Sequence, residues 1–264
     1  MTGTNTDVTG TGVIASFHLL RYAHLDAMRH MAFDRPKLRA TPGLSFWRLL
    51  GTGRGRSMSL GADLRRWALF AVWDDEAALA EFSARSAVAN RWRAEAEEAW
   101  HVRLRPLSSR GRWGGRDPFN ALPTAHPPAT APLAVLTRAS IRPHRLMAFY
   151  RAVPEVDLSL ADQDGCLASI GVGEWPLARQ ATFSLWCNET AINRFAYQGD
   201  AHRDVIGQVR RHDWYSEELF ARFVPYESEG TWDGRDPLRG HLSSPSRAGA
   251  ARRERRRTRP PDAV

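Results

Sequence analysis

The sequence predicts an α+β fold in which tandem ferredoxin-like (β-α-β-β-α-β) repeats form a pseudo-dimeric α+β barrel. The first observation is an internal repeat: residues 105–119 (RPLSSRGRWGGRDPF) align without a gap to residues 224–238 (VPYESEGTWDGRDPL), and eight of the fifteen positions are identical. The second is a weaker match upstream, where residues 67–82 and 180–195 share Trp73/Trp186 and Phe82/Phe195 in register. A repeat of this length indicates one folding unit present twice.

Each copy alternates strand-like and helix-like segments in the same order. The first copy has apolar strands at 13–20, 43–51 and 67–73, a helix-like segment at 24–33, and a second helix capped by Asp74 or Asp75. The second copy has strands at 133–141, 165–173 and 180–186, a helix-like segment at 144–153, and a helix after Asn188. A four-stranded sheet with helices on one face leaves its other face bare. The two copies therefore bury these faces together, and we expect a cavity between sheets and helices.

The repeat also divides the 264-residue chain. We expect a disordered N-terminus (1–12), a first ferredoxin-like repeat (13–117), a Pro/Ala-rich linker (118–132), a second repeat (133–238) and a disordered Arg-rich tail (239–264). The formal net charge is +8, but residues 241–264 hold seven Arg against Glu254 and Asp262, a local +5, which leaves +3 for the rest. We therefore expect no specific nucleic-acid partner, although binding of nucleic acid through the tail stays open.

Several other classes of protein are disfavoured. Two cysteines, Cys166 and Cys187, are too few for a disulfide framework, which indicates a cytoplasmic protein. The longest apolar run, 67–73, is far shorter than the roughly 18 residues of a membrane span. We expect a soluble protein and leave peripheral membrane contact open. No GxSxG elbow frames a serine, no His or Cys pair has zinc spacing, and GTGRGR (51–56) lacks the end of a phosphate loop.

Four segments resemble the spheroidene monooxygenase family of carotenoid-modifying enzymes: FWRLLGTGRGRSM (46–58), WALFAVWDD (67–75), GRWGGRDPF (111–119), and FAYQGDAHRDVI (195–206) followed by WYSEELFARF (214–223). The resemblance covers about residues 13–238. It implies a monooxygenase that takes O2 as co-substrate, contains heme iron, receives electrons from a ferredoxin-like donor and introduces a keto group at an allylic carbon of an acyclic carotenoid.

If heme is bound, we expect His202 to be its axial ligand. Neutral imidazole is the usual proximal ligand of heme iron, and Asp200 or Asp204 is close enough in sequence to fix its tautomer. The alternative is that His202 is a surface residue. His18 on the first strand is the strongest competitor, and His24, His101, His144 and His212 are the others. Arg54 and Arg56 could pair with heme propionates or with an acidic donor surface, or lie in a plain loop between strands.

Aromatic side chains are the candidates for a hydrophobic substrate site. Trp47, Phe195 and Tyr197, together with Phe46, Phe70 and Phe183, could line an apolar cavity, although core residues would give the same pattern. The repeated tryptophans favour a packing role, and the two GRDP turns favour a structural one. No catalytic residue is assigned. The alternative function is a cofactor-free or non-catalytic α+β-barrel protein that binds a small hydrophobic ligand.

Overall fold

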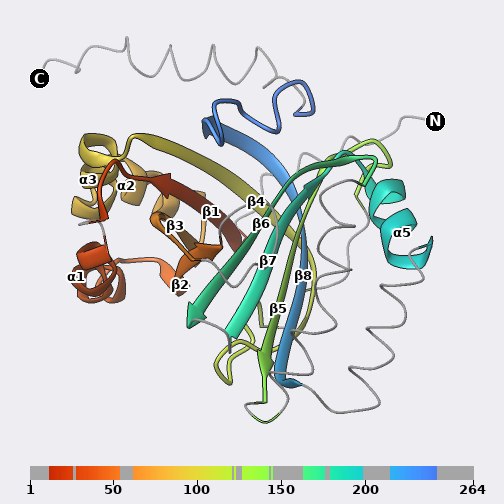
Figure 1. Ribbon diagram of the computed structural model, residues 1–264, viewed down its shortest axis with the longest axis horizontal. Coiled ribbons are helices and arrows are strands. Elements are labelled where there is room, and N and C mark those ends of the chain that lie inside the picture. Colours follow the sequence, from red (N-terminus) through yellow and green to blue (C-terminus); the bar gives the residue numbers. More distant parts are fainter. Residues whose placement is uncertain are drawn as a thin grey trace, which may run out of the picture.

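Eight antiparallel strands close into a barrel in the order β1-β3-β2-β6-β7-β5-β8-β4 (Figure 1). The computed structural model describes residues 12–25, 28–53, 62–120, 122, 127–142, 144, 163–175, 179–198 and 215–242. The strands are β1 (Ile14–Arg21), β2 (Leu44–Gly53), β3 (Ala62–Trp73), β4 (Glu98–Gly111), β5 (Leu133–Ile141), β6 (Cys166–Trp175), β7 (Arg179–Trp186) and β8 (Tyr215–Gly230). The helices are α1 (Met28–Arg39), α2 (Glu76–Arg85), α3 (Ala87–Glu95) and α5 (Glu189–Gln198).

The first half follows the predicted order, with one addition. Its elements run β1-α1-β2-β3-α2-α3-β4, so two short helices stand where one was predicted. The second half runs β5-β6-β7-α5-β8 in the described residues. The helix predicted at 144–153 lies, apart from His144, outside these residues. An α+β fold is therefore observed, whereas the tandem ferredoxin-like repeat stays a prediction.

Local sequence explains where the helices begin. The Asp75 carboxylate accepts a hydrogen bond from Ala78 N at 2.8 Å, and the Asn188 side chain accepts one from Ala191 N at 2.9 Å, as expected for N-caps. Ser86 ends α2 and caps α3 through Ala89 N at 3.0 Å, which explains the additional helix. Helix α1 starts four residues later than predicted, because its buried side is set by Asp34 and Leu38.

The barrel interior is filled by side chains from both halves. Phe17 of β1 stacks on Phe183 of β7 with ring centroids 4.0 Å apart, and Phe70 of β3 stacks on Trp113 at 5.8 Å. These residues are fully or almost fully buried. The part of the barrel interior around these residues is therefore filled by side chains.

Two further clusters lie outside the barrel, between the sheet and the helices. Trp73 and Phe82 belong to the larger cluster, under α1 to α3, and Trp186 and Phe195 to the smaller one, beside α5. In Figure 1 the two groups of helices lie on opposite sides of the barrel. Trp73 and Trp186 are at most 2% exposed, which confirms the predicted packing role.

The two GRDP segments form turns held by carboxylates, which agrees with the structural role expected from the sequence. Glu217 accepts hydrogen bonds from the backbone N–H groups of Gly114 and Gly115 at 2.8 and 2.6 Å. In the second copy Glu98 accepts from Gly234 N at 2.7 Å. Both turns place Trp113 and Trp232 in the interior core, so their role is structural.

Candidate functional site

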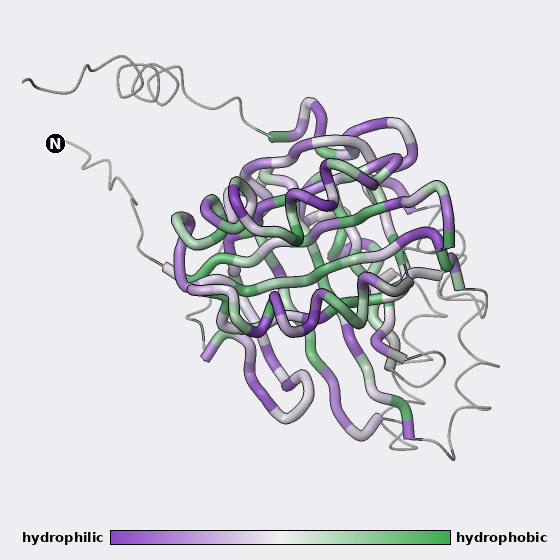
Figure 2. The backbone as a smooth tube through the Cα atoms, turned by 90° about the vertical axis from the view of Figure 1, so that its left-hand side faces the viewer, coloured by the Kyte–Doolittle hydropathy of each residue, from purple (hydrophilic) through white to green (hydrophobic). Residues whose placement is uncertain are grey.

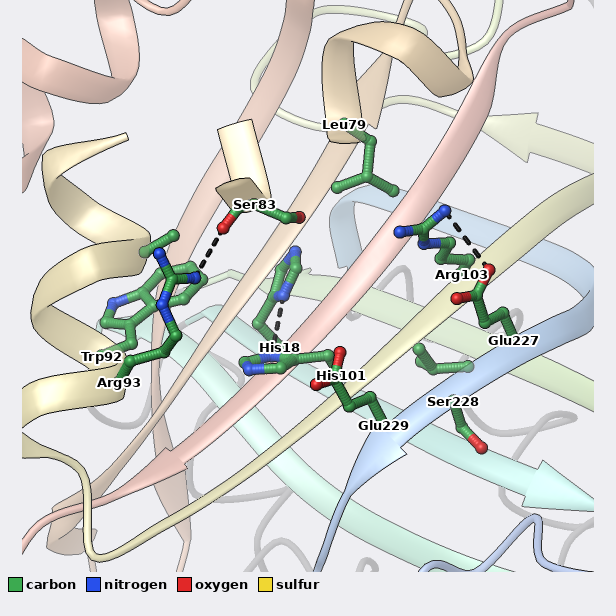
Figure 3. Close-up of a pocket in the computed structure, with 12 residues that line it drawn as sticks. His18, Leu79, Ser83, Trp92, Arg93, His101, Arg103, Glu227, Ser228 and Glu229 are labelled. Carbon is green, nitrogen blue, oxygen red and sulfur yellow. Dashed lines mark hydrogen bonds and ion pairs between the residues drawn. The ribbon is translucent and has the colours of Figure 1, made fainter. Parts of the chain in front are cut away.

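A polar pocket of about 120 Å³ lies between the first half of the sheet and helices α2 and α3 (Figure 3). His18 of β1 and His101 of β4 form its floor; they are opposite each other in the strand register. His18 faces the helices, whereas its neighbours Phe17 and Leu19 face the barrel interior. The rest of the lining is Leu79, Ser83, Ala89, Trp92, Arg93, Val102, Arg103, Glu227, Ser228 and Glu229.

A chain of hydrogen bonds runs from a buried tryptophan to this pocket. Trp73 Nε1 donates to Ser16 Oγ at 2.9 Å, Ser16 Oγ lies 2.8 Å from His18 Nε2, and His18 Nδ1 lies 3.0 Å from His101 Nδ1. An indole N–H only donates, so the arrangement that satisfies every atom has Ser16 donating to His18 Nε2. His18 then donates from Nδ1 to His101 Nδ1, which leaves His101 with its proton on Nε2.

Burial keeps both histidines neutral. Desolvation is the main cause that lowers the pKa of His18 well below 6.5, and the neighbouring His101 and the Arg103 charge act in the same direction. Burial also lowers the pKa of His101 to about 4, against an opposing effect of Glu229 and with a small contribution from Arg93. Both imidazoles therefore act as hydrogen-bonding groups at neutral pH.

The size of this pocket decides what it can hold. Pockets for drug-sized ligands have volumes of roughly 300–1,000 Å³, so a pocket of about 120 Å³ is too small for a polyene. Its two arginines are already occupied, since Arg103 pairs with Glu76 and Glu227 and Arg93 binds Ser83 O, Ala84 O and the Asn90 side chain. The pocket fits a few water molecules, and the site for a large hydrophobic substrate must lie elsewhere.

The corresponding face of the second half is built from smaller side chains. In each half, one residue from each of four neighbouring strands forms a row on the side away from the barrel interior. The row of the first half is Leu49, Leu69, His18 and His101. The equivalent row of the second half is Gly171, Thr182, Thr137 and Phe220. The second row thus has a glycine and two threonines in place of two leucines and a histidine.

Burial confirms the difference between the two rows. Leu49, Leu69 and His18 are all at most 8% exposed, because α1 to α3 pack against them. Thr137 is exposed and Thr182 is half-buried. The second row therefore has smaller side chains and more exposure at Thr137 and Thr182, whereas Gly171 is buried. We call this surface, made by Ser169, Gly171, Gly173, Thr137 and Thr182, the open face.

Buried polar atoms at the open face lack partners. Ser169 is 4% exposed and its Oγ has no hydrogen-bond partner in the structure. Arg222 of β8 pairs with Glu189 of α5 at 2.7 Å, whereas its Nε has no partner. Unsatisfied buried polar atoms are rare in folded proteins and mark places where water or a ligand binds.

The sequence-predicted site residues fall into three groups. His202, Arg54 and Arg56 lie outside the described residues, as does the side chain of Tyr197. Trp47 is half-buried in the cluster under α1 to α3, and Phe195 packs on Trp186 with ring centroids 5.5 Å apart. Phe46, Phe70 and Phe183 lie in the barrel interior. The structure does not bring Trp47 and Phe195 together, because they lie in different clusters outside the barrel.

Sequence reasoning missed the His18–His101 pair and the open face. The pairing of β1 with β4 joins residues 83 positions apart, and no local pattern shows it. The open face does have a signal: aligning the second strands of the two halves, GLSFWRLLG (43–51) and GCLASIGVG (165–173), places Ser169 and Gly171 against Trp47 and Leu49.

The described residues contain neither a metal-binding cluster of side chains nor a membrane-spanning helix. No three His, Cys, Asp or Glu side chains there gather closely enough to hold a metal ion. Within the same residues, no helix is both long enough and apolar enough to cross a membrane.

Three relatives named spheroidene monooxygenase match most of the chain. The protein from Rhodobacter capsulatus is 37% identical over 229 residues, which are 85% of this chain and 95% of the relative. The protein from Rubrivivax gelatinosus is 40% identical over 208 residues, 78% of each chain. The protein from Cereibacter sphaeroides is 34% identical over 209 residues, which are 78% of this chain and 64% of the relative. No protein-family model matches the sequence.

Solved structures with the same fold include two of aldoxime dehydratases. One has a TM-score of 0.55 and 15% identity, and covers 88% of this chain and 89% of its own. The other, a complex with butyraldoxime, has a TM-score of 0.55 and 13% identity, and the alignment covers 87% of this chain and 85% of the dehydratase chain. At this level of identity the likeness concerns the fold alone.

Proposed function

The chain belongs to the spheroidene monooxygenase family, and we propose that it is an oxygen-dependent monooxygenase that oxidises a carotenoid or a related hydrophobic isoprenoid at the open face of its second half. The observation that carries the site is the contrast between the two halves, with small side chains at Gly171, Thr182 and Thr137 where the first half is packed. The reaction we propose is conversion of an allylic methylene group to a ketone by two successive oxygenations, each of which consumes one O2 and two electrons from a ferredoxin-like donor and releases one water, followed by loss of a further water from the dihydroxylated carbon.

The residues of the open face fit a flat, largely apolar cofactor such as heme. Glycine and threonine are smaller than the leucines and histidine at the equivalent positions of the first half, and Val135 and Phe220 supply apolar contacts at the edge of the face. The unpartnered Ser169 Oγ and Arg222 Nε offer hydrogen bonds to polar groups of a ligand. We propose that His202 is the axial ligand, since neutral imidazole is the usual proximal ligand of heme iron and its segment lies between α5 and β8 in the sequence.

When bound, heme would supply the activation of O2, and the protein supplies position and environment. The packed strands β5 to β8 provide a rigid wall, and the filled barrel interior behind Phe183 and Phe223 excludes water from that side. Arg222 is held by Glu189, which fixes its guanidinium beside the open face. We propose Arg54 and Arg56 as partners for propionates or for an acidic, ferredoxin-like electron donor.

Binding of heme to the purified full-length protein tests this proposal. We expect a Soret band after reconstitution with hemin, and its loss in the variant His202→Ala. A band that is unchanged in His202→Ala would move the axial ligand elsewhere. Absence of any band from well-folded protein would favour the alternative of a cofactor-free barrel that binds a small hydrophobic ligand.

A pair of variants at one position tests the place of the cofactor. Thr182→Leu places at this position the residue that the first half has at Leu69. We expect it to weaken hemin binding at least about tenfold, because the larger leucine side chain would occupy space that the cofactor needs. Thr182→Ala removes atoms from the same position and should leave binding nearly unchanged. Equal affinity of both variants would place the cofactor away from the open face.

A further inference from the structure

Helix α1 exposes large apolar side chains at the surface. Phe33 is 64% exposed, and Leu25, just before the helix, is 55% exposed. Residues four apart lie on one side of a helix, so Phe33 and Lys37 share the outer side, whereas Asp34 and Leu38 share the buried one. The helix lies on the side of the molecule that faces the viewer in Figure 2.

The exposed charges on this helix are all positive. Arg35, Lys37 and Arg39 are exposed, and the acidic residue among them, Asp34, is 2% exposed and paired with Arg91 of α3. Within the residues that the structure describes, no carboxylate forms an ion pair with Arg35, Lys37 or Arg39. The residues from Phe33 to Arg39 therefore present a net charge of about +3 to solvent around one protruding phenyl ring.

This pattern differs from that of most arginines on the strands of the barrel. Arg65 pairs with Glu97, Arg66 with Asp233, and Arg103 with Glu76 and Glu227. A cluster of exposed basic side chains without carboxylate partners adds repulsion between like charges and no ion-pair stabilisation to the fold. The cluster is best explained by a partner with negative charge.

We propose that the outer side of α1, with Phe33, Leu25, Arg35, Lys37 and Arg39, binds the surface of an anionic lipid bilayer. An amphipathic helix with basic and large apolar residues lies in the membrane interface, where apolar groups enter the acyl region and basic groups contact lipid headgroups. The proposal rests on the proposed function in one respect, since a carotenoid substrate dissolves in the bilayer and must be collected from it.

The shape and composition of the surface favour a bilayer over an acidic protein. A protein interface buries roughly 800 Å² on each partner with complementary shape. Helix α1 is instead convex and presents a single aromatic ring amid flexible basic side chains, which a fluid interface accommodates without a matching surface. An acidic protein partner is therefore an alternative outcome of the test.

Binding of the full-length protein to vesicles tests the proposal without heme or activity. We expect the protein to float with vesicles of phosphatidylcholine and phosphatidylglycerol, to bind pure phosphatidylcholine much less, and to be released by salt. Replacing Arg35, Lys37 or Arg39 by Gln should weaken binding about fivefold for each charge. Phe33→Ala should weaken it about tenfold, because the ring no longer enters the apolar layer.

Two matched variants control for loss of any apolar or basic residue. Leu64 of β3 is 40% exposed, and Arg85 of α2 is exposed, so Leu64→Ala and Arg85→Gln should bind as the parent does. The Arg-rich tail is present in every variant, so its contribution is constant. The proposal is overturned if the α1 variants bind vesicles as tightly as the parent, or if they instead lose affinity only for an acidic electron-donor protein. Vesicle binding without a Soret band would leave this proposal standing and remove the proposed function.

Discussion

Acidification should destabilise the protein through His101, and the loss can be calculated. The pKa of His101 falls from 6.5 in the unfolded chain to about 4 in the folded protein, chiefly because of burial. Between these values the unfolded chain binds a proton that the folded protein does not, so the free energy of unfolding falls as the pH drops through this window. One pH unit corresponds to about 1.36 kcal/mol, so the loss is at most about 3 kcal/mol and is complete near pH 4.

The variant His101→Phe isolates this contribution. The equivalent position of the second half holds Phe220, so a phenyl ring suits this register. The variant leaves His18 Nδ1–H without its acceptor, which should cost about 1–3 kcal/mol at neutral pH. It should also remove the contribution of His101 to the fall in the free energy of unfolding between pH 6.5 and 4, because phenylalanine does not titrate.

Urea unfolding of both proteins at a series of pH values measures the two effects. His18 contributes in the same direction, and because His101 is one of the causes that lower the pKa of His18, the His18 share should also shrink in the variant. A pH dependence that is identical in parent and variant would show that the buried imidazole is not the group that titrates.

Three further pairs of variants test the packing of the fold by the same unfolding assay. Asp34→Ala leaves the Arg91 guanidinium unpaired in a buried position and should cost about 3–5 kcal/mol, whereas Glu81→Ala, which breaks the exposed pair with Arg85, should cost less than about 0.5 kcal/mol; equal losses would contradict the burial argument. Gly230→Ala should be much more destabilising than Gly234→Ala. Both glycines have positive φ, but a Cβ at Gly230 would lie 2.0 Å from Ala99 O, whereas a Cβ at Gly234 would have no neighbouring atom within 4 Å. Similar urea midpoints of the two variants would contradict this argument. Asp75→Ala and Asn188→Ala should each cost about 1 kcal/mol as lost N-caps, and an unaffected stability would show that neither cap matters.

Local signals in the sequence were sufficient for most elements. The run at 133–141 coincides with β5, and Asp75 and Asn188 mark the starts of α2 and α5. Strand alternation and capping act within a few residues, so they can be read without knowledge of the partner strands. The duplicated GRDP turn indicated two related segments, and Glu217 and Glu98 accept hydrogen bonds from Gly115 and Gly234 at equivalent positions of the two turns.

Features that depend on distant partners could not be predicted. The position of α1 depends on the buried pair of Asp34 with Arg91, 57 residues away, and the helix continues through Pro36 to Arg39, beyond the predicted end at residue 33. The register of β2 turns Trp47 toward the helices of the first half, and its role in substrate binding stays a prediction. The open face became visible only when the rows of the two half-sheets were compared strand by strand.

The absorption spectrum of the full-length protein after incubation with hemin tests the central claim most directly. We expect a Soret band in the parent, a weaker one in Thr182→Leu, and none in His202→Ala. Hemin binding that is absent from the folded parent, or that is equally strong in all three proteins, would contradict a heme-dependent oxygenase site on the open face.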